Sequence, residues 1–252
     1  MTHDSLFYRT TASVALQGKW PVAALAAFVY ALIGGNVVSS LWDKLEPVLE
    51  ASNAYGLIIA IGIVLIIYCV AALILNGAIR MGYVLFNLKL IDGKEVSVKD
   101  LFSQLHRIGD GIVMQLLTTI FLILWSLLLI VPGIIKSFAY SMAPYILLEH
   151  PDFSGGDAIT RSKELMDGNK ARLFWLKLSF IGWLLLAAVP AFIGTLIAAF
   201  IPGLTLVGVL LSLVTAVLSY FVEAYMCAAE AAFYRDITTF NQTPDAGSTY
   251  AG

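Results

Sequence analysis

Charged side chains within apolar stretches are the residues of this sequence best suited to chemistry. Arg80, Lys136 and Glu223 each stand in or beside a long run of apolar residues. A charge at membrane depth is costly, so each such residue is a candidate for binding a ligand or carrying a proton. Tyr140 and Tyr145 lie on one apolar segment and could add hydroxyl groups to such a site. These five residues form the candidate ligand-binding set.

A structural role is the alternative for each of them. Arg80 and Lys177 stand near the ends of apolar stretches, where long side chains can reach the headgroups and anchor a helix. Glu223 and Glu230, on the last apolar stretch, could pair with these cations instead of binding a proton or a cation. Lys136 could likewise serve as an anchor, and the tyrosines could make ordinary hydrogen bonds between helices.

Motifs of known catalytic chemistry do not occur in the sequence. It contains no Gly-x-Ser-x-Gly, no His-Glu-x-x-His, no phosphate-binding glycine loop and no Cys-x-x-Cys. The three histidines are scattered, and Cys69 and Cys227 each lie in an apolar run, which is typical of cysteines that only pack. We therefore expect no enzymatic activity, no cofactor and no bound metal.

The composition is that of an integral membrane protein. Hydrophobic residues make up 60% of the 252 residues and charged residues 13%, whereas a soluble domain carries about 25% charged residues. Because lipid leaves only helices or closed barrels as viable backbones, the long uncharged runs predict helices surrounded by membrane lipids. The net charge of −2 argues against a nucleic-acid partner, which would need a basic surface.

Six apolar segments are long enough to be considered as membrane spans. They cover about 20–41, 55–79, 112–131, 134–148, 173–200 and 204–229. Pro132-Gly133 separates the third from the fourth, and Pro202-Gly203 the fifth from the sixth. Proline followed by glycine suits a tight type II turn, so we predict that these two pairs are the tips of helical hairpins.

The distribution of basic residues predicts the orientation. With both termini in the cytoplasm, only Lys44 and Lys136 of the fifteen lysines and arginines fall on the outer side. Cytoplasmic loops of membrane proteins carry the excess of lysine and arginine. We expect a bacterial cytoplasmic membrane protein with both ends inside, a single transmembrane domain over 1–235 and a polar, disordered tail over 236–252.

A weak internal repeat organises the expected spans. Residues 83–111 and 140–168 align at an offset of 57 without gaps, and each copy contains Ser-x-x-Asp, at Ser97 and at Ser154. This pattern is typical of a helix N-terminus, and it predicts short amphipathic helices over 97–108 and 157–167 at the cytoplasmic interface. A looser copy precedes the first span and ends at Gly18. The predicted fold is thus all-α: six transmembrane helices as three hairpins, each preceded by an interfacial helix.

Several strings of the sequence resemble an uncharacterised bacterial integral-membrane family, domain of unknown function 975. They are Ala15–Trp20, Leu124–Leu128, Val131–Lys136, Tyr140–Ile146, Arg161–Gly168 and Leu178–Trp183. The family is also similar to the membrane domain of some glycerophosphodiester phosphodiesterases, whose hydrolase domain has no counterpart here. The resemblance implies a multi-span bacterial membrane protein and implies no activity.

Two functions remain open on the sequence alone. The first is transport or binding of a small or amphiphilic, lipid-like ligand within the helix bundle, which broken spans at Pro144 and Pro190 favour. The second is a structural or accessory role, in which the cytoplasmic interfacial helices sense the membrane or dock a partner, either another membrane protein or a second copy of the chain. A polar cavity containing Tyr140, Glu223 or Lys136 would favour the first.

Overall fold

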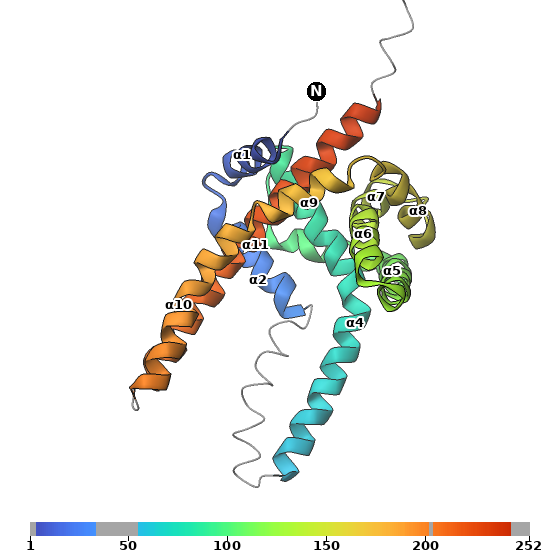
Figure 1. Cartoon of the computed structure of the whole chain (residues 1–252). Coiled ribbons are helices and arrows are strands. Elements are labelled where there is room, and N and C mark those ends of the chain that lie inside the picture. Colours follow the sequence, from blue (N-terminus) through green and yellow to red (C-terminus); the bar gives the residue numbers. More distant parts are fainter. Residues whose placement is uncertain (1–3, 34–54, 202–203, 243–252) are drawn as a thin grey trace, which may run out of the picture.

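A computed structural model describes residues 4–33, 55–201 and 204–242, and this part of the chain is built of helices without any β-strand (Figure 1). The α-helices are α1 (Ser5–Leu16), α2 (Trp20–Ile33), α4 (Tyr55–Ile91), α5 (Ile108–Leu128), α6 (Ile130–Tyr140), α7 (Ala143–Glu149), α8 (Gly155–Leu165), α9 (Lys170–Leu178), α10 (Ile181–Phe200) and α11 (Thr205–Gln242). Two short 3₁₀ helices, η1 (Val98–Phe102) and η2 (Leu105–Arg107), precede α5.

Apolar side chains cover much of the outer surface of these helices. Leu127, Ile130 and Phe200 are 84%, 75% and 80% exposed. Within the described residues, five helical segments have the length and apolar composition to cross a membrane, or six if α1 and α2 together count as one bent span. A soluble protein would not expose so much apolar surface, so the chain is a multi-pass membrane protein. The arrangement as three hairpins stays a prediction.

The helices α1 and α2 meet at an angle of 105°. The Asp4 side chain caps α1 by accepting a hydrogen bond from the Ser5 backbone N–H. Gly18 has a φ of 74°, a left-handed conformation that suits glycine, and the chain turns sharply there. This confirms the predicted helix before the first span. The predicted end of that span, 34–41, lies outside the described residues.

The helix α4 continues well beyond the predicted span end at residue 79. It runs unbroken past Arg80 to Ile91, and Gly93 with a φ of 71° follows it. A charged residue can end the apolar part of a helix without ending the helix, because arginine is a good helix former. At 1.5 Å per residue, α4 is about 55 Å long and extends outside the hydrocarbon layer.

The two Ser-x-x-Asp motifs both form capping boxes. Ser97 with Asp100, and Ser154 with Asp157, exchange hydrogen bonds between side chain and backbone at the two ends of each motif. The second motif begins α8, which confirms a short helix there, and Gly168 with a φ of 75° lies beyond the end of α8. The copies agree in their first turn.

For the first copy of the repeat, the predicted type of helix is wrong. Residues 97–108 form η1 and η2 in place of one amphipathic α-helix. The backbone of Leu101 lies against Gly82 of α4, so close that a Cβ on Gly82 would be 2.0 Å from the Leu101 carbonyl oxygen. This contact buries Leu101, while Phe102 stays exposed. Packing on α4 thus overrides the helical period of the segment.

The turn predicted at Pro132-Gly133 is also wrong. The chain reverses at Leu129, which is extended (φ −162°, ψ 141°), and both Pro132 and Gly133 lie in the first turns of α6. Proline is tolerated there because the first helical N–H groups have no helical partner. Gly133 is needed for close packing, since its Cβ would lie 2.5 Å from Ser126 Oγ of α5. Pro202 and Gly203 lie outside the described residues.

The last three helices are the two consecutive helices α9 and α10 and the long helix α11. The helices α9 and α10 follow each other across a short break at Ser179 and Phe180, and α10 then pairs side by side with α11 (Figure 1). Pro190 lies inside α10, where Thr215 Oγ1 of α11 accepts a hydrogen bond from the Ala191 backbone N–H over 2.8 Å. The helix α11 reaches Gln242, so the first part of the predicted disordered tail, 236–242, is helical.

Candidate functional site

A polar cavity of about 200 Å³ lies among α2, α4, α7, α9 and α11. Its lining includes three of the five residues selected from the sequence, Arg80, Tyr145 and Glu223. The other lining residues are Tyr30, Tyr83, Val84, Asn87, Ser141, Pro144, Lys177, Met226, Cys227 and Glu230. Residues about 140 positions apart in the sequence therefore meet at one site.

Small residues let the surrounding helices approach closely enough to form this site. Gly77 of α4 touches Gly111 of α5, and a Cβ on Gly77 would lie 2.3 Å from the Gly111 carbonyl carbon. On α11, Ala224 and Ala228 are buried beside the cavity-lining residues. Small side chains at helix contacts are typical of membrane proteins, where close backbone approach replaces the hydrophobic effect as the source of packing energy.

One pair of charges in the cavity is neutralised internally. Lys177 Nζ of α9 lies 2.7 Å from Glu230 Oε1 of α11. The predicted pairing of a basic residue near a span end with an acid of the last helix is thus present for these two residues. The ion pair joins α9 to α11 at the side of the cavity and stabilises both charges.

The other two charges, on Arg80 and Glu223, have no ion-pair partner among the described residues. Arg80 Nη1 donates to Gln115 Oε1 of α5 over 3.3 Å, and Glu223 Oε1 accepts a weak hydrogen bond from Cys227 Sγ at 3.5 Å. An uncharged amide and a thiol compensate a charge poorly. The cavity therefore presents one cation and one carboxylate that can still bind groups of opposite charge.

Aromatic rings form two walls of the cavity. Tyr30 of α2 stacks on Tyr83 of α4 with ring centroids 4.8 Å apart and planes 12° apart. Tyr145 of α7 stacks on Tyr234 of α11 at 4.8 Å and 27°. Asn87, which is buried, donates from its side-chain amide to the Tyr83 carbonyl oxygen over 2.8 Å. These stacked rings, which come from four separate helices, fix the shape of the site.

The predicted interruption of the fourth apolar segment borders the cavity. The helix α6 ends at Tyr140, Pro144 stands in the first turn of α7, and Ser141 and Pro144 both line the site. A proline cannot supply the N–H that would continue the preceding helix, so the break follows from the sequence. Discontinuous helices at membrane depth frequently surround substrate sites in transporters.

Two residues of the predicted set do not line the cavity. Lys136 of α6 places its Nζ 4.7 Å from the centroid of the Trp125 ring of α5, in a cation–π contact. Tyr140 is buried, and its ring lies 6.1 Å from that of Phe121. Both side chains serve the packing of the α5–α6 pair. Their polar character alone did not reveal to which side of α6 they project.

Several cavity residues were absent from the predicted set. Tyr83 and Asn87 follow the residue at which the second span was expected to end, so they were not considered as interior positions. The signal for them was the absence of proline from 55 to 91 and the glycine after that stretch. Cys227 was expected only to pack, and Lys177 was expected to anchor its helix. The spacing of Glu223, Cys227 and Glu230 on one helical face was a signal for their grouping.

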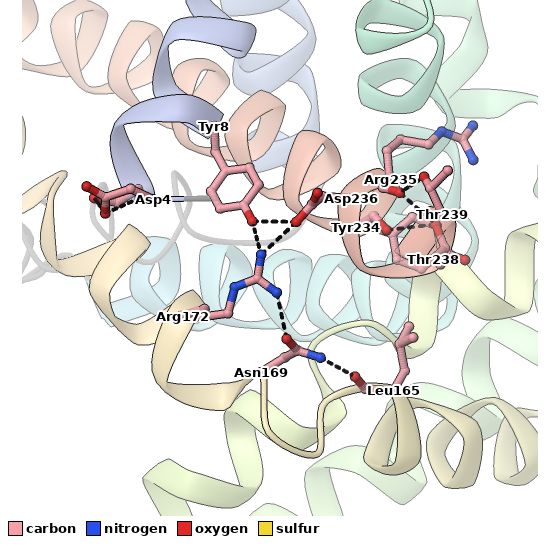
Figure 2. Close-up of polar contacts among 11 residues, drawn as sticks. Asp4, Tyr8, Leu165, Asn169, Arg172, Tyr234, Arg235, Asp236, Thr238 and Thr239 are labelled. Carbon is pink, nitrogen blue, oxygen red and sulfur yellow. Dashed lines mark hydrogen bonds and ion pairs between the residues drawn. The ribbon is translucent and has the colours of Figure 1, made fainter. Parts of the chain in front are cut away.

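A second polar cluster joins α1, α9 and α11 around Arg172 (Figure 2). Arg172 Nη2 lies 2.6 Å from Asp236 Oδ2, the Tyr8 hydroxyl donates to the same oxygen over 2.6 Å, and Arg172 Nη2 also contacts the Tyr8 hydroxyl. Arg172 Nη1 donates to Asn169 Oδ1 over 2.7 Å. Burial, together with the hydrogen bond to Asp236, raises the pKa of Tyr8. Tyr8 therefore stays protonated at physiological pH and holds α1 on α11.

Within the described residues, no group of three or more His, Cys, Asp and Glu side chains is arranged to hold a metal ion. Comparison with known families gives one match: residues 127–241 match the family described as Protein of unknown function (DUF975). The match confirms the resemblance seen in the sequence over its C-terminal part. No curated protein and no solved structure matches the chain. The further likeness to phosphodiesterase membrane domains stays a prediction.

Proposed function

We propose that this chain, whose residues 127–241 match the family described as Protein of unknown function (DUF975), binds a small polar or amphiphilic ligand in the cavity beside Arg80 and Glu223. The observation that carries the proposal is the presence, in one cavity, of two half-buried charges of opposite sign without ion-pair partners among the described residues. Keeping such charges in a membrane protein is costly unless they serve a site.

The charges indicate the chemistry of the ligand. A guanidinium binds a carboxylate or phosphate, and a carboxylate binds an ammonium group or a hydroxyl donor. A ligand with both kinds of group would satisfy Arg80 and Glu223 together. At about 200 Å³, the cavity is smaller than the roughly 300 Å³ at which drug-sized sites begin. This size favours a small zwitterion or the headgroup of an amphiphile.

The broken helix beside the cavity supports a transport-type role over simple binding, because such breaks allow one helix segment to move relative to the other. The accessory role is the second candidate, and it would suit a closed core without access for water. The proposal includes no catalytic step. We further propose that both termini lie in the cytoplasm of a bacterial cell, because the lysines and arginines fall almost entirely on that side.

Thiol labelling of Cys227 tests whether the cavity is accessible. In a Cys69→Ser variant, a water-soluble methanethiosulfonate should modify Cys227 under native conditions, since its thiol lines the cavity. Enlarging Ser141 to tryptophan should fill the space and slow the modification at least tenfold. If Cys227 reacts only after unfolding, the core is closed and the accessory role is favoured.

A thermal-shift screen tests binding itself. Glycerophosphoethanolamine and free amino acids are suitable zwitterionic probes. A binding compound should raise the melting temperature of the wild-type chain and of the matched control Lys136→Gln, whose side chain lies outside the cavity. The same compound should have no effect on Arg80→Gln or Glu223→Gln. Equal shifts in all four proteins would contradict a site at these charges.

A further inference from the structure

An apolar groove of about 370 Å³ separates the pair α1–α2 from the pair α10–α11. Its lining includes Ser13, Trp20, Trp183, Ala187, Phe221 and Tyr225. Successive residues of a helix are rotated by about 100°, so residues two positions apart point to nearly opposite sides. Phe221 and Tyr225 of the groove are two positions from Glu223 and Cys227 of the polar cavity. The groove is therefore a separate site on the other side of α11.

Arg9 is adjacent to residues that line this groove. Ser13, one helical turn after Arg9 on α1, lines the groove. The hydroxyl of Tyr225, another lining residue, donates to the Arg9 carbonyl oxygen over 3.0 Å. The Arg9 guanidinium lies 5.6 Å from the centroid of the Phe180 ring, which itself packs edge-on against Tyr225 at 4.9 Å. Arg9 is thus fixed at the boundary of the apolar groove.

No acidic side chain among the described residues neutralises the charge of Arg9. None of the ion pairs among the described residues includes it. Its Nε atom is buried and makes no hydrogen bond to any residue that the structure describes. A buried guanidinium nitrogen without a partner is costly, so an external acceptor is expected. An anionic oxygen is the group that best suits a guanidinium.

The surroundings of Arg9 place it at the membrane surface. The helix α1 exposes Leu6 and Val14 and turns by 105° into the apolar helix α2. This geometry is typical of a helix lying in the interface before a span begins. Tryptophans such as Trp20 and Trp183 are enriched at the same depth. An acyl chain in the groove would therefore extend into the membrane, with its headgroup level with Arg9.

We propose that this groove binds an anionic phospholipid, with the phosphate on the Arg9 guanidinium and one acyl chain against Trp20 and Trp183. The cluster around Arg172 supports the site, because Tyr8 is bonded to Asp236 and Arg172 and is the residue before Arg9 (Figure 2). Those bonds fix the position of α1 on α11. The lipid would then join the interfacial helix to the α10–α11 pair.

Quenching of tryptophan fluorescence by brominated lipids tests this proposal. Replacing Trp42, Trp125 and Trp175 by phenylalanine leaves Trp20 and Trp183, the two tryptophans of the groove, as reporters. In vesicles of mixed phosphatidylglycerol and phosphatidylcholine, we expect phosphatidylglycerol to compete about fivefold better for the groove, since one surface cation favours anionic lipid by about that factor.

The variants separate the parts of the site. Arg9→Gln should abolish the preference, Arg9→Lys should retain it, and the matched control Lys163→Gln on the exposed face of α8 should leave it unchanged. Ser13→Phe should reduce quenching by both lipids, because it fills the groove. Equal quenching by the two lipids in the parent protein would overturn the proposal, and so would a preference that survives Arg9→Gln. If Arg9→Gln does not fold, high salt must weaken the preference of the parent protein.

Discussion

Lys177 and Glu230 form the internal ion pair of the polar cavity, and the carboxylate of Glu230 is the more buried partner. Its side chain is 15% exposed, against 38% for Lys177. Replacing Lys177 by methionine leaves this carboxylate without its partner, so we expect a loss of about 1–3 kcal/mol of stability. The measurement is thermal unfolding in detergent.

The control for this prediction is Arg161→Met. Arg161 pairs with Glu164 on α8, where both side chains are more than half exposed. Exposed pairs contribute at most about 1 kcal/mol. Equal losses in the two variants would mean that the Lys177–Glu230 pair is as solvated as a surface pair, and that its contribution to the cavity is small.

Tyr8 provides a second prediction for single residues. Tyr8→Phe removes the hydroxyl that bonds to Asp236 while keeping the ring, which packs edge-on against Phe233 at 5.4 Å. A hydrogen bond to a charged group contributes about 1.5–3 kcal/mol, so a destabilisation of that size is expected. Thr10→Val is the control, because the Thr10 hydroxyl bonds only within α1, to the Phe7 carbonyl oxygen. An unchanged melting temperature in Tyr8→Phe would show that the Tyr8 hydroxyl does not help to hold α1 on α11.

Among the helices, α8 depends on a capping box with a titratable member. Hydrogen bonds from the Ser154 hydroxyl and backbone N–H lower the pKa of Asp157, below the usual value of about 3.9. A lowered pKa means that the carboxylate stabilises the folded helix above pH 4, and that this stabilisation is lost as the pH falls through the lowered value.

Hydrogen exchange of the first amides of α8 measures this loss. Relative to the intrinsic exchange rate at each pH, protection of these amides should fall below about pH 4. In Asp157→Asn the protection should be lower at neutral pH and should no longer change over this range, because asparagine does not titrate. Wild-type protection that is constant down to pH 2 would contradict the role of Asp157.

The contact between α4 and α5 is a further test of how helices are positioned. A Cβ on Gly111 would lie 2.7 Å from the Gly77 carbonyl carbon, which is backbone and cannot move aside cheaply. Gly111→Ala should destabilise the protein by about 1–3 kcal/mol. Because the shift moves Gln115 relative to Arg80, it should also change the labelling rate of Cys227.

Gly62→Ala is the matched control on α4. A Cβ at Gly62 has no heavy atom within 4 Å, so alanine there should stabilise the helix by about 0.5–1 kcal/mol. If the two alanine variants behaved alike, the separation of α4 and α5 would not be set by these glycines.

At the scale of the whole molecule, the membrane topology can be tested by finding on which side of the membrane each end of the chain lies. The N-terminal helix α1 and the C-terminal end of α11 lie at one end of the molecule, and the junction of α10 with α11 lies at the other (Figure 1). In a chain without Cys69 and Cys227, cysteines at Thr10 and Thr239 should label from the cytoplasmic side, and a cysteine at Ile201 from the outside. Labelling of Thr10 and Thr239 from opposite sides would require an odd number of spans.

The sequence by itself determined the class of the protein and several of its local features. Long apolar runs leave helices as the membrane-compatible structure, Ser-x-x-Asp favours a capped helix start, and Pro144 interrupts the helix before it. Each of these depends on residues within a few positions of one another, so a local pattern suffices. The ends of α1 and α8 at Gly18 and Gly168 were predictable for the same reason.

The tertiary structure decided which polar groups meet. Arg80, Tyr145 and Glu223 share a cavity while Lys136 and Tyr140 pack within the α5–α6 pair, although all five looked alike as polar residues in apolar runs. The direction of a side chain depends on which face of its helix packs against which neighbour, and that is set by contacts such as Gly77 with Gly111 and Gly82 with Leu101. Those contacts join residues 19 to 34 positions apart, and no local pattern encodes them. The same dependence moved the hairpin turn to Leu129, because Gly133 is used to approach Ser126 and not to reverse the chain.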